Sequence, residues 1–376
     1  MHRFWPSSLA ALWLAAAGGE EPRHVVVARE PGSFLAWPAN GGLWTWDDGQ
    51  EALVAFVSGA FVEQPGHNIG PRHTNRLARS RDGGSTWTVE QPTGFAQPGA
   101  TFGVLTHGLD FTGPGFALRC TATGYHGAED GRGGFLCSTD RGRSWRGPFR
   151  FAGLDGCAEL RGWELTCRTD YLVDGPAAAL VLLSARTPGK GGTDRTCWAR
   201  TTDGGQRWRF GGWVVGRDDP FRAVMPATVR LSPTRLVTAL RRRALDREPC
   251  WLDAWRSDDN GATWRFVSRI GETGVGNGNP PALLRLRDGR LCCAYGNRSR
   301  RQMLASLSRD DGATWDPPLV LRDGFRPDRF GDADFGYPRQ FQRADGQVVT
   351  IYYWSQNDAP ESCIAATIWT APGEPR

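Results

Sequence analysis

The chain has 376 residues and a formal net charge of +5, from 45 basic and 40 acidic residues. Its 49 glycines, 25 prolines and 17 tryptophans favour many short strands and tight turns, and no long helical period is apparent beyond the N-terminus. The basic residues are nearly all arginine and are scattered without a nucleic-acid-binding motif, which argues against a nucleic-acid partner and stays compatible with an anionic ligand.

The N-terminus has the form of a secretory signal peptide. A short basic start is followed by an apolar run over residues 9–17, and the small residues that end this run suit cleavage near Ala17. The run is too short to span a bilayer. We therefore expect residues 1–20 to be a signal peptide or an N-terminal tail, residues 21–376 to form one folded unit, and the protein to be secreted or periplasmic without a membrane span.

A short motif recurs five times, at intervals of roughly 50–60 residues, which is the mark of a propeller, solenoid or array. It reads Ser or Thr, then Asp two residues later, Gly two residues after that, and finally Trp. The copies span residues 80–87, 138–145, 201–208, 257–264 and 308–315. The Asp carboxylate can accept hydrogen bonds from the turn, the Gly supplies a positive φ, and the Trp buries a large apolar surface. Each copy, which we call a repeat turn, predicts a hairpin between two strands.

Both ends of the chain have the composition of strands. Residues 24–28 form one strand-like run, and residues 348–353 and 363–369 form two more after the last repeat turn. In a propeller, one terminus commonly completes the sheet built by the other, which leaves no exposed sheet edge. Five segments with repeat turns and this last segment predict an all-β, six-bladed β-propeller with terminal strand closure.

The repeat turns resemble the Asp-box, or bacterial neuraminidase repeat, of the sialidase superfamily. The chain from about residue 24 to 370 is similar to the six-bladed propeller of that superfamily, and some segments look closer to little-characterised bacterial exo-α-sialidase-like proteins. The resemblance implies that the repeat turns lie away from the active site and that a glycan ligand sits over the central channel. It implies a glycoside hydrolase acting on terminal sugars, acidic ones included.

Tyr337 is the candidate nucleophile. It lies near the start of the sixth blade, where sialidases carry a nucleophilic tyrosine, and it is followed by Pro338 and Arg339. A neutral phenol attacks an anomeric carbon beside a carboxylate with less charge repulsion, but it needs a base to accept its proton. Asp334 and Asp170 are the candidate acid/base groups. The alternative is that Tyr337 is a core residue at a blade joint.

Several other residues are candidates for contacting the substrate. Arginines near strand ends or blade starts suit an anionic group, because the guanidinium fork matches a carboxylate: Arg168, Arg222, Arg241, Arg298 and Arg339. Each taken singly also suits an ion pair between blades. Trp46 is a candidate for stacking on a sugar, with blade core as the alternative. His67 lies in a long loop of the first blade, and loops at a channel mouth often carry function.

The sequence departs from the sialidase pattern at four places, one of which is the strand end at residues 56–60, where a glutamate and an arginine are expected. Ala36 stands where the first-blade arginine is expected, and residues 225–227 lack the glutamate expected at the start of the fourth blade. Glu63 is the only acidic residue between Val62 and Arg79, so the catalytic aspartate of that loop is missing. Standard sialidase chemistry is therefore less well supported than cleavage of another glycan by rearranged residues. The alternative from a different class is a non-catalytic carbohydrate-binding propeller.

No cofactor motif is apparent in the sequence. Nine cysteines contain no C-x-x-C pair and lack metal-ligand spacing, so no metal site is expected, although a structural calcium ion stays open. The odd number prevents complete internal pairing. We expect most cysteines to be buried apolar residues, with one or two disulfides open if the protein is exported.

Overall fold

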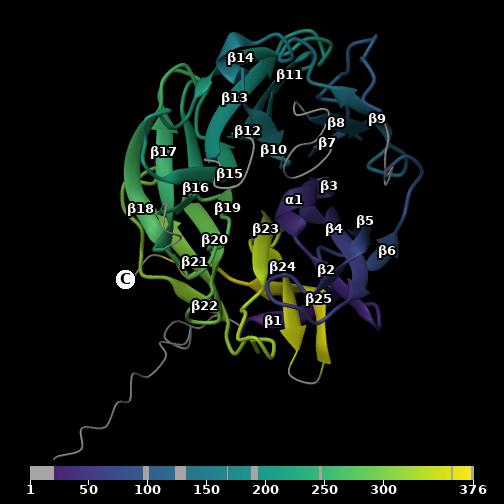
Figure 1. Cartoon of the computed structure of the whole chain (residues 1–376), viewed down its shortest axis with the longest axis vertical. Helices are drawn as coiled ribbons and strands as arrows, with labels where there is room; N and C mark the ends of the chain where they lie inside the picture. Colours follow the sequence, from purple (N-terminus) through teal and green to yellow (C-terminus); the bar gives the residue numbers. More distant parts are fainter. Residues whose placement is uncertain are drawn as a thin grey trace, which may run out of the picture.

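The computed structural model describes residues 21–95, 101–122, 133–166, 168–187, 194–244, 248–356 and 359–373. The predicted signal segment, residues 1–20, lies outside these described residues. Within them, the strands form six antiparallel sheets arranged around a common axis, and Figure 1 looks along that axis. The six-bladed propeller predicted from the repeat is therefore confirmed. No helix of the described part is long and apolar enough to cross a membrane.

Each blade is one antiparallel sheet. The first blade contains β2 (Ser33–Ala36), β3 (Leu43–Trp46), β4 (Glu51–Phe61), β5 (Ile69–Ser80) and β6 (Thr88–Glu90). The second contains β7 (Ala117–Thr121), β8 (Gly134–Ser138) and β9 (Arg146–Arg150). The third contains β10 (Glu164–Thr166), β11 (Tyr171–Gly175), β12 (Ala178–Arg186), β13 (Asp194–Thr201) and β14 (Arg209–Trp213). In the first and third blades two short strands, β2 with β3 and β10 with β11, both pair with one longer strand.

The remaining blades have four strands each. The fourth contains β15 (Arg222–Arg230), β16 (Leu236–Arg243), β17 (Cys250–Ser257) and β18 (Arg265–Gly274). The fifth contains β19 (Ala282–Arg285), β20 (Leu291–Asn297), β21 (Gln302–Ser308) and β22 (Leu319–Arg322). The sixth contains β23 (Gly336–Gln342), β24 (Val348–Gln356), β25 (Ala359–Trp369) and β1 (Arg23–Ala28). Three single-turn helices, α1 (Pro38–Gly41), η1 (Asp47–Gly49) and η2 (Ala158–Leu160), complete the assigned elements of the described part.

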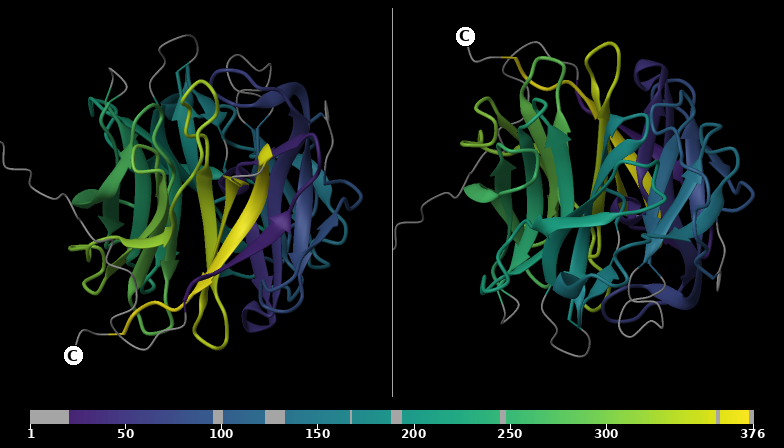
Figure 2. Two further views of the ribbon diagram at one scale, coloured as in Figure 1. Left: turned by 90° about the horizontal axis from the view of Figure 1, so that it is seen from below. Right: turned by 90° about the horizontal axis from the view of Figure 1, so that it is seen from above.

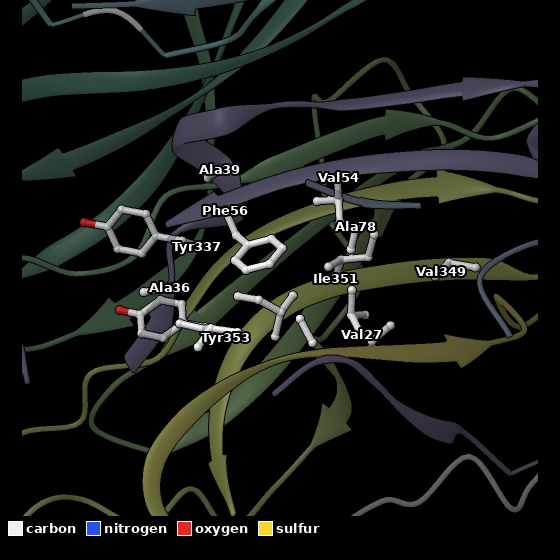
Figure 3. Packing of buried hydrophobic residues seen from close by; sticks show 14 of the residues in the cluster. Val27, Ala36, Ala39, Val54, Phe56, Ala78, Tyr337, Val349, Ile351 and Tyr353 are labelled. Carbon is white, nitrogen blue, oxygen red and sulfur yellow. The ribbon is translucent and has the colours of Figure 1, made fainter. Parts of the chain in front are cut away.

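The ring is closed by the two ends of the chain. Strand β1 pairs with β25 in antiparallel register, for example Val25 with Ala366, as the sequence predicted (Figure 2). Behind this seam, apolar residues of the first and sixth blades pack together, with Val54 and Phe56 facing Ile351 (Figure 3). Middle strands such as β20 are buried along their whole length, because neighbouring blades cover both faces.

The strand registers distinguish two faces of the ring. In the fourth blade, Arg222 at the start of β15 pairs with Arg243 at the end of β16, which in turn pairs with Cys250 at the start of β17. The repeat turn follows the far end of β17, after Ser257. We call the face where innermost strands begin the start face and the opposite one the turn face.

The repeat turns are held together by their own residues. In the copy at residues 308–315, Oδ1 of Asp310 accepts from the Ser308 hydroxyl at 2.9 Å and the Thr314 amide at 2.8 Å. Its Oδ2 accepts from the Thr314 hydroxyl at 2.6 Å, and Gly312 has a φ of 85°. The copies with Asp82, Asp140 and Asp259 repeat these bonds. The turns are therefore local scaffold features on the face opposite the strand starts.

Candidate active site

Three blades carry the same backbone feature on their innermost segment. Trp37, Met225 and Tyr337 each precede a proline and have positive φ values of 60°, 57° and 49°. Such a conformation is uncommon for non-glycine residues and disfavoured before proline, so it stores local strain. The register of β15 and that of β23 both shift at this point, as in a β-bulge, which changes the direction of a side chain. The strain therefore concentrates where the blades converge.

Tyr337 is fixed from the neighbouring fifth blade. Its backbone N–H donates to Oδ1 of Asn279 at 2.8 Å, and Nδ2 of Asn279 donates to the Phe335 carbonyl at 2.8 Å. Asn279 is fully buried, and its side-chain amide fixes the backbone of residues 335–337 at two points. The phenol oxygen of Tyr337 accepts from Nη1 of Arg241 at 3.1 Å. Figure 3 shows the hydroxyls of Tyr337 and Tyr353 pointing the same way, away from Phe56.

The phenol of Tyr337 lies in a positive field. Burial alone would raise its pKa, but the charges of Arg241, Arg298, His67 and Arg168 lower the pKa of Tyr337 to about 8. A phenol with this pKa is partly ionised near neutral pH, which is what a tyrosine nucleophile requires.

Asp334 connects three groups around this tyrosine. One carboxylate oxygen accepts from Nδ1 of His67 at 2.8 Å, and the other accepts from Nη2 of Arg298 at 3.2 Å and from the Tyr353 hydroxyl. Burial would raise the pKa of Asp334, but the hydrogen bond and charge of His67, together with Arg298, hold it below its usual value. Burial and the charge of Asp334 raise the pKa of Tyr353 well above its usual value. Asp334 is therefore a buried anion that orients its partners.

His67 lies on a loop that is tied to the segment preceding β23. The amide of Gly66 donates to Asp332 at 2.7 Å, and the side chain of Asn68 donates to Asp328 at 3.0 Å. The imidazole lies edge-on to Trp37, with ring centroids 5.0 Å apart. Its partial burial lowers the pKa of His67, but the hydrogen bond and charge of Asp334 outweigh this and raise it above its usual value.

The predicted arginines divide into two groups. Arg241 contacts Tyr337, Arg298 contacts Asp334, and the charge of Arg168 acts on Tyr337, so these three belong to one cluster. Arg222 is paired with Asp194. The guanidinium of Arg339 donates to the carbonyls of Ala39 at 2.7 Å and of Thr169 at 2.5 Å. Arg222 and Arg339 thus have partners within the scaffold, as does Arg241, whose Nε donates to the Asn277 carbonyl at 2.6 Å.

Asp170 and Trp46 lie apart from Tyr337 in their contacts. Asp170 accepts from the amide of Thr228 at 3.2 Å and from its hydroxyl at 2.7 Å, across the joint between the third and fourth blades. Burial raises the pKa of Asp170 to about 7, against the lowering effect of Thr228 and Arg339. Trp46 pairs with Glu51 at the start of β4 and lies under Arg141 of the second repeat turn, which is the turn-face end of the blade.

Tyr353, Asn279 and Trp37 also belong to this cluster and were not among the predicted site residues. A signal for Trp37 was present, because the chain places a large side chain before proline in Trp37-Pro38, Met225-Pro226 and Tyr337-Pro338. Tyr353 and Asn279 gave no such signal, since their partners come from other blades or from the far end of a hairpin.

No group of three or more His, Cys, Asp or Glu side chains suited to a metal ion occurs in the described ranges. The eight cysteines found there are free thiols, and all but Cys157 are buried. Burial raises the pKa of thiols such as Cys120 and Cys292 to about 12. The seven buried cysteines are thus apolar packing residues, as expected for most of the cysteines.

The fold of this chain is shared by solved structures of glycosidases and of a protein of unknown function. A Hadza microbial sialidase is 17% identical, with a TM-score of 0.57, and the match covers 89% of this chain and 65% of that one. The GH93 α-L-arabinofuranosidase of Fusarium graminearum is 13% identical, with a TM-score of 0.54 and coverage of 92% and 96%. A protein of unknown function from Dyadobacter fermentans is 21% identical, with a TM-score of 0.70 and coverage of 93% and 99%.

Residues 120–350 match the model of the BNR repeat-like domain, and the chain belongs to this family. No curated protein matches the sequence. The solved relatives share the fold at identities too low to transfer a substrate, and those with a named activity act on different sugars.

Proposed function

We propose that the protein is a glycoside hydrolase that cleaves a terminal sugar carrying an anionic group, with Tyr337 as its nucleophile. The observation that carries this proposal is a buried phenol bonded to Arg241 and surrounded by the charges of Arg298, His67 and Arg168. These cations favour the phenolate before substrate binds. They also favour an anionic sugar, since a guanidinium binds a carboxylate with two parallel hydrogen bonds.

In this proposal Tyr337 attacks the anomeric carbon, and a glycosyl-enzyme intermediate forms and is then hydrolysed, as in retaining glycosidases. Arg241 and Arg168 bind the anionic group of the substrate, while Arg298 is held by Asp334. The strained backbone at Tyr337, fixed by Asn279, keeps the phenol oriented without help from the ligand.

The test is a panel of terminal glycosides, namely sialosides, uronides and α-L-arabinofuranosides, with wild type and Tyr337→Phe. We expect one acidic glycoside to be cleaved and kcat to fall by about 10³-fold or more in the variant, as for other lost nucleophiles. Tyr295→Phe is the matched control, because Tyr295 is buried in the fifth blade with its hydroxyl near Ser306. Full activity of Tyr337→Phe would contradict the assignment of Tyr337 as the nucleophile.

The second candidate is a carbohydrate-binding propeller without catalysis. It is favoured by the hydrogen bonds that already occupy both predicted acid/base carboxylates, Asp334 and Asp170. Glycan binding by calorimetry with no turnover across the panel would select it.

Export from the cytoplasm is part of the same proposal, on the basis of the signal-like residues 1–20. Amino-terminal sequencing of protein recovered from the periplasm or medium would show a start near residue 18 if the signal is cleaved. A mature chain that begins at Met1 would contradict it.

A further inference from the structure

Hydrolysis of a glycoside needs a group that gives a proton to the leaving oxygen and later takes one from water. Asp334 is poorly suited, because it is 5% exposed and its two oxygens accept from three donors. Asp170 is similarly buried and bonded to Thr228. The loop with Glu63 lacks the aspartate that the sialidase pattern places there, and Glu63 lies beside Arg329. A residue other than these three carboxylates must therefore supply the proton.

His67 has the exposure and the orientation that this role requires. Its side chain is 47% exposed, against 5% for its partner Asp334. Because Nδ1 faces the Asp334 carboxylate at 2.8 Å, Nδ1 carries a proton that it donates to that oxygen. Nε2 is then the nitrogen left for a ligand. A carboxylate behind an imidazole fixes its tautomer and stabilises its protonated form.

The loop holds the imidazole in a fixed position. Asp332 binds the residue before His67, and Asp328 binds the residue after it. Trp37 packs against the ring, and the side chain of Gln64 donates to the His67 carbonyl at 2.8 Å. A group anchored from four sides has little freedom to lose on substrate binding, as expected of a catalytic group.

We infer that His67 is the acid/base catalyst of this hydrolase, with Asp334 as its positioning residue, an inference that rests on the proposed function. In the first step the Tyr337 oxygen bonds to the anomeric carbon, the bond to the leaving oxygen breaks, and Nε2 of His67 gives its proton to that oxygen. In the second step neutral His67 takes a proton from water, whose oxygen bonds to the anomeric carbon as the bond to Tyr337 breaks. Both groups return to their starting states.

The charged groups that face His67 determine its titration. Asp334 raises its pKa, the charge of Arg298 lowers it, and ionised Tyr337 raises it. Asp332 and Asp328 contact the residues on either side. Activity requires phenolate on Tyr337 and a proton on His67, so the rate rises and then falls with pH. At high pH the rate falls because the enzyme form that has both ionised Tyr337 and protonated His67 disappears.

The experiment compares His67→Asn with wild type on two glycosides of the sugar that the panel identifies, a methyl glycoside and a 4-nitrophenyl glycoside. Methoxide is a strong base, so it leaves only when it receives a proton from the catalyst, whereas nitrophenolate is a weak base and leaves without one. We expect kcat/KM to fall about 10²–10⁴-fold on the methyl glycoside and far less on the nitrophenyl glycoside. The variant should also lose the alkaline fall of its pH–rate profile. His73→Asn, on an exposed histidine of β5, is the matched control.

Equal losses on both glycosides with an unchanged pH profile would reduce His67 to a structural residue and overturn the inference. Asp334→Asn gives a second readout, because without the carboxylate the imidazole loses the acceptor that fixes its tautomer, so kcat/KM should again fall more on the methyl glycoside than on the nitrophenyl glycoside. Equal losses on both glycosides in Asp334→Asn would also count against the inference. If wild type cleaves no glycoside of the panel while folding normally, the proposed function fails instead, so the two failures are distinguishable.

Discussion

The two faces of the propeller use aspartate in opposite ways. On the turn face, Asp310 accepts from Ser308 and Thr314, which lie two residues before it and four residues after it. On the start face, Asp334 accepts from Tyr353, Arg298 and His67, which lie 19, 36 and 267 residues away along the chain. The first carboxylate is exposed and the second is buried. One stabilises a turn, and the other assembles a site.

This difference has an energetic consequence. The partners of Asp310 are near it in any conformation of the chain, and water competes for its hydrogen bonds. The partners of Asp334 meet only when the ring is closed, in surroundings where charges interact more strongly. Removing the buried carboxylate should therefore cost much more free energy of unfolding than removing an exposed one.

Asp334→Ala should have the largest effect. The change leaves Arg298 and protonated His67 without a counter-ion and Tyr353 without an acceptor, so the free energy of unfolding should fall by about 3–5 kcal/mol near pH 6. Urea unfolding would measure this loss. Tyr353→Phe is the control, since it removes one donor and leaves the ion pairs, and a smaller loss is expected. A loss below about 1 kcal/mol, the range of exposed ion pairs, would contradict the comparison.

The same loss should depend on pH. The folded pKa of Asp334 lies below its unfolded value of about 3.9, so its contribution is fully present above that value and disappears as pH falls through the folded pKa. The folded pKa of His67 lies above its unfolded value of about 6.5, so its contribution is present below that value and disappears as pH rises through the folded pKa. The difference in free energy of unfolding between wild type and Asp334→Ala should thus become smaller in acid and again above neutral pH.

A spectroscopic titration should reveal the positive field on the start face. Among the five described tyrosines, Tyr337 alone has a lowered pKa, about 8, whereas burial raises the pKa of Tyr171 and Tyr295 to about 12. The near-ultraviolet absorbance of phenolate should show one tyrosine ionising around pH 8, and Tyr337→Phe should lack it. Arg241→Gln should move this step upward by about one pH unit or more. A first step near pH 10 in wild type would show that the cations do not act on this phenol.

The fold could be predicted from the sequence because the repeat turns depend on residues that are close together along the chain. The spacing of the five aspartates predicted the blades, and the apolar residues 24–28 predicted the strand that closes the ring. The site depends on contacts between blades, so only residues marked by family resemblance, by a loop position or by a place near a strand end were found, as with Tyr337, His67 and Arg241. Trp46 shows the limit: an aromatic residue in a strand does not reveal which end of the blade it occupies. Asn279 and Tyr353 have partners that no sequence spacing reveals.

The smallest effect should come from the turn face. Asp310→Ala removes the acceptor of three hydrogen bonds, but water can reach the freed donors, so the free energy of unfolding should fall by only about 1–2 kcal/mol. Asp316→Ala is the matched control, because it removes the same charge from the neighbouring exposed pair with Arg309, and it should cost less than about 1 kcal/mol.

Neither Asp310→Ala nor Asp316→Ala should change kcat or the pH–rate profile, because Asp310 and Asp316 lie on the face opposite Tyr337. The two measurements needed are urea unfolding and turnover of the identified glycoside. If Asp310→Ala lowered kcat as strongly as Asp334→Ala, the repeat turns would be coupled to the site through the blades, and the division of labour between the two faces would be wrong. If Asp310→Ala changed the free energy of unfolding alone, this repeat turn would stabilise its own hairpin without affecting catalysis.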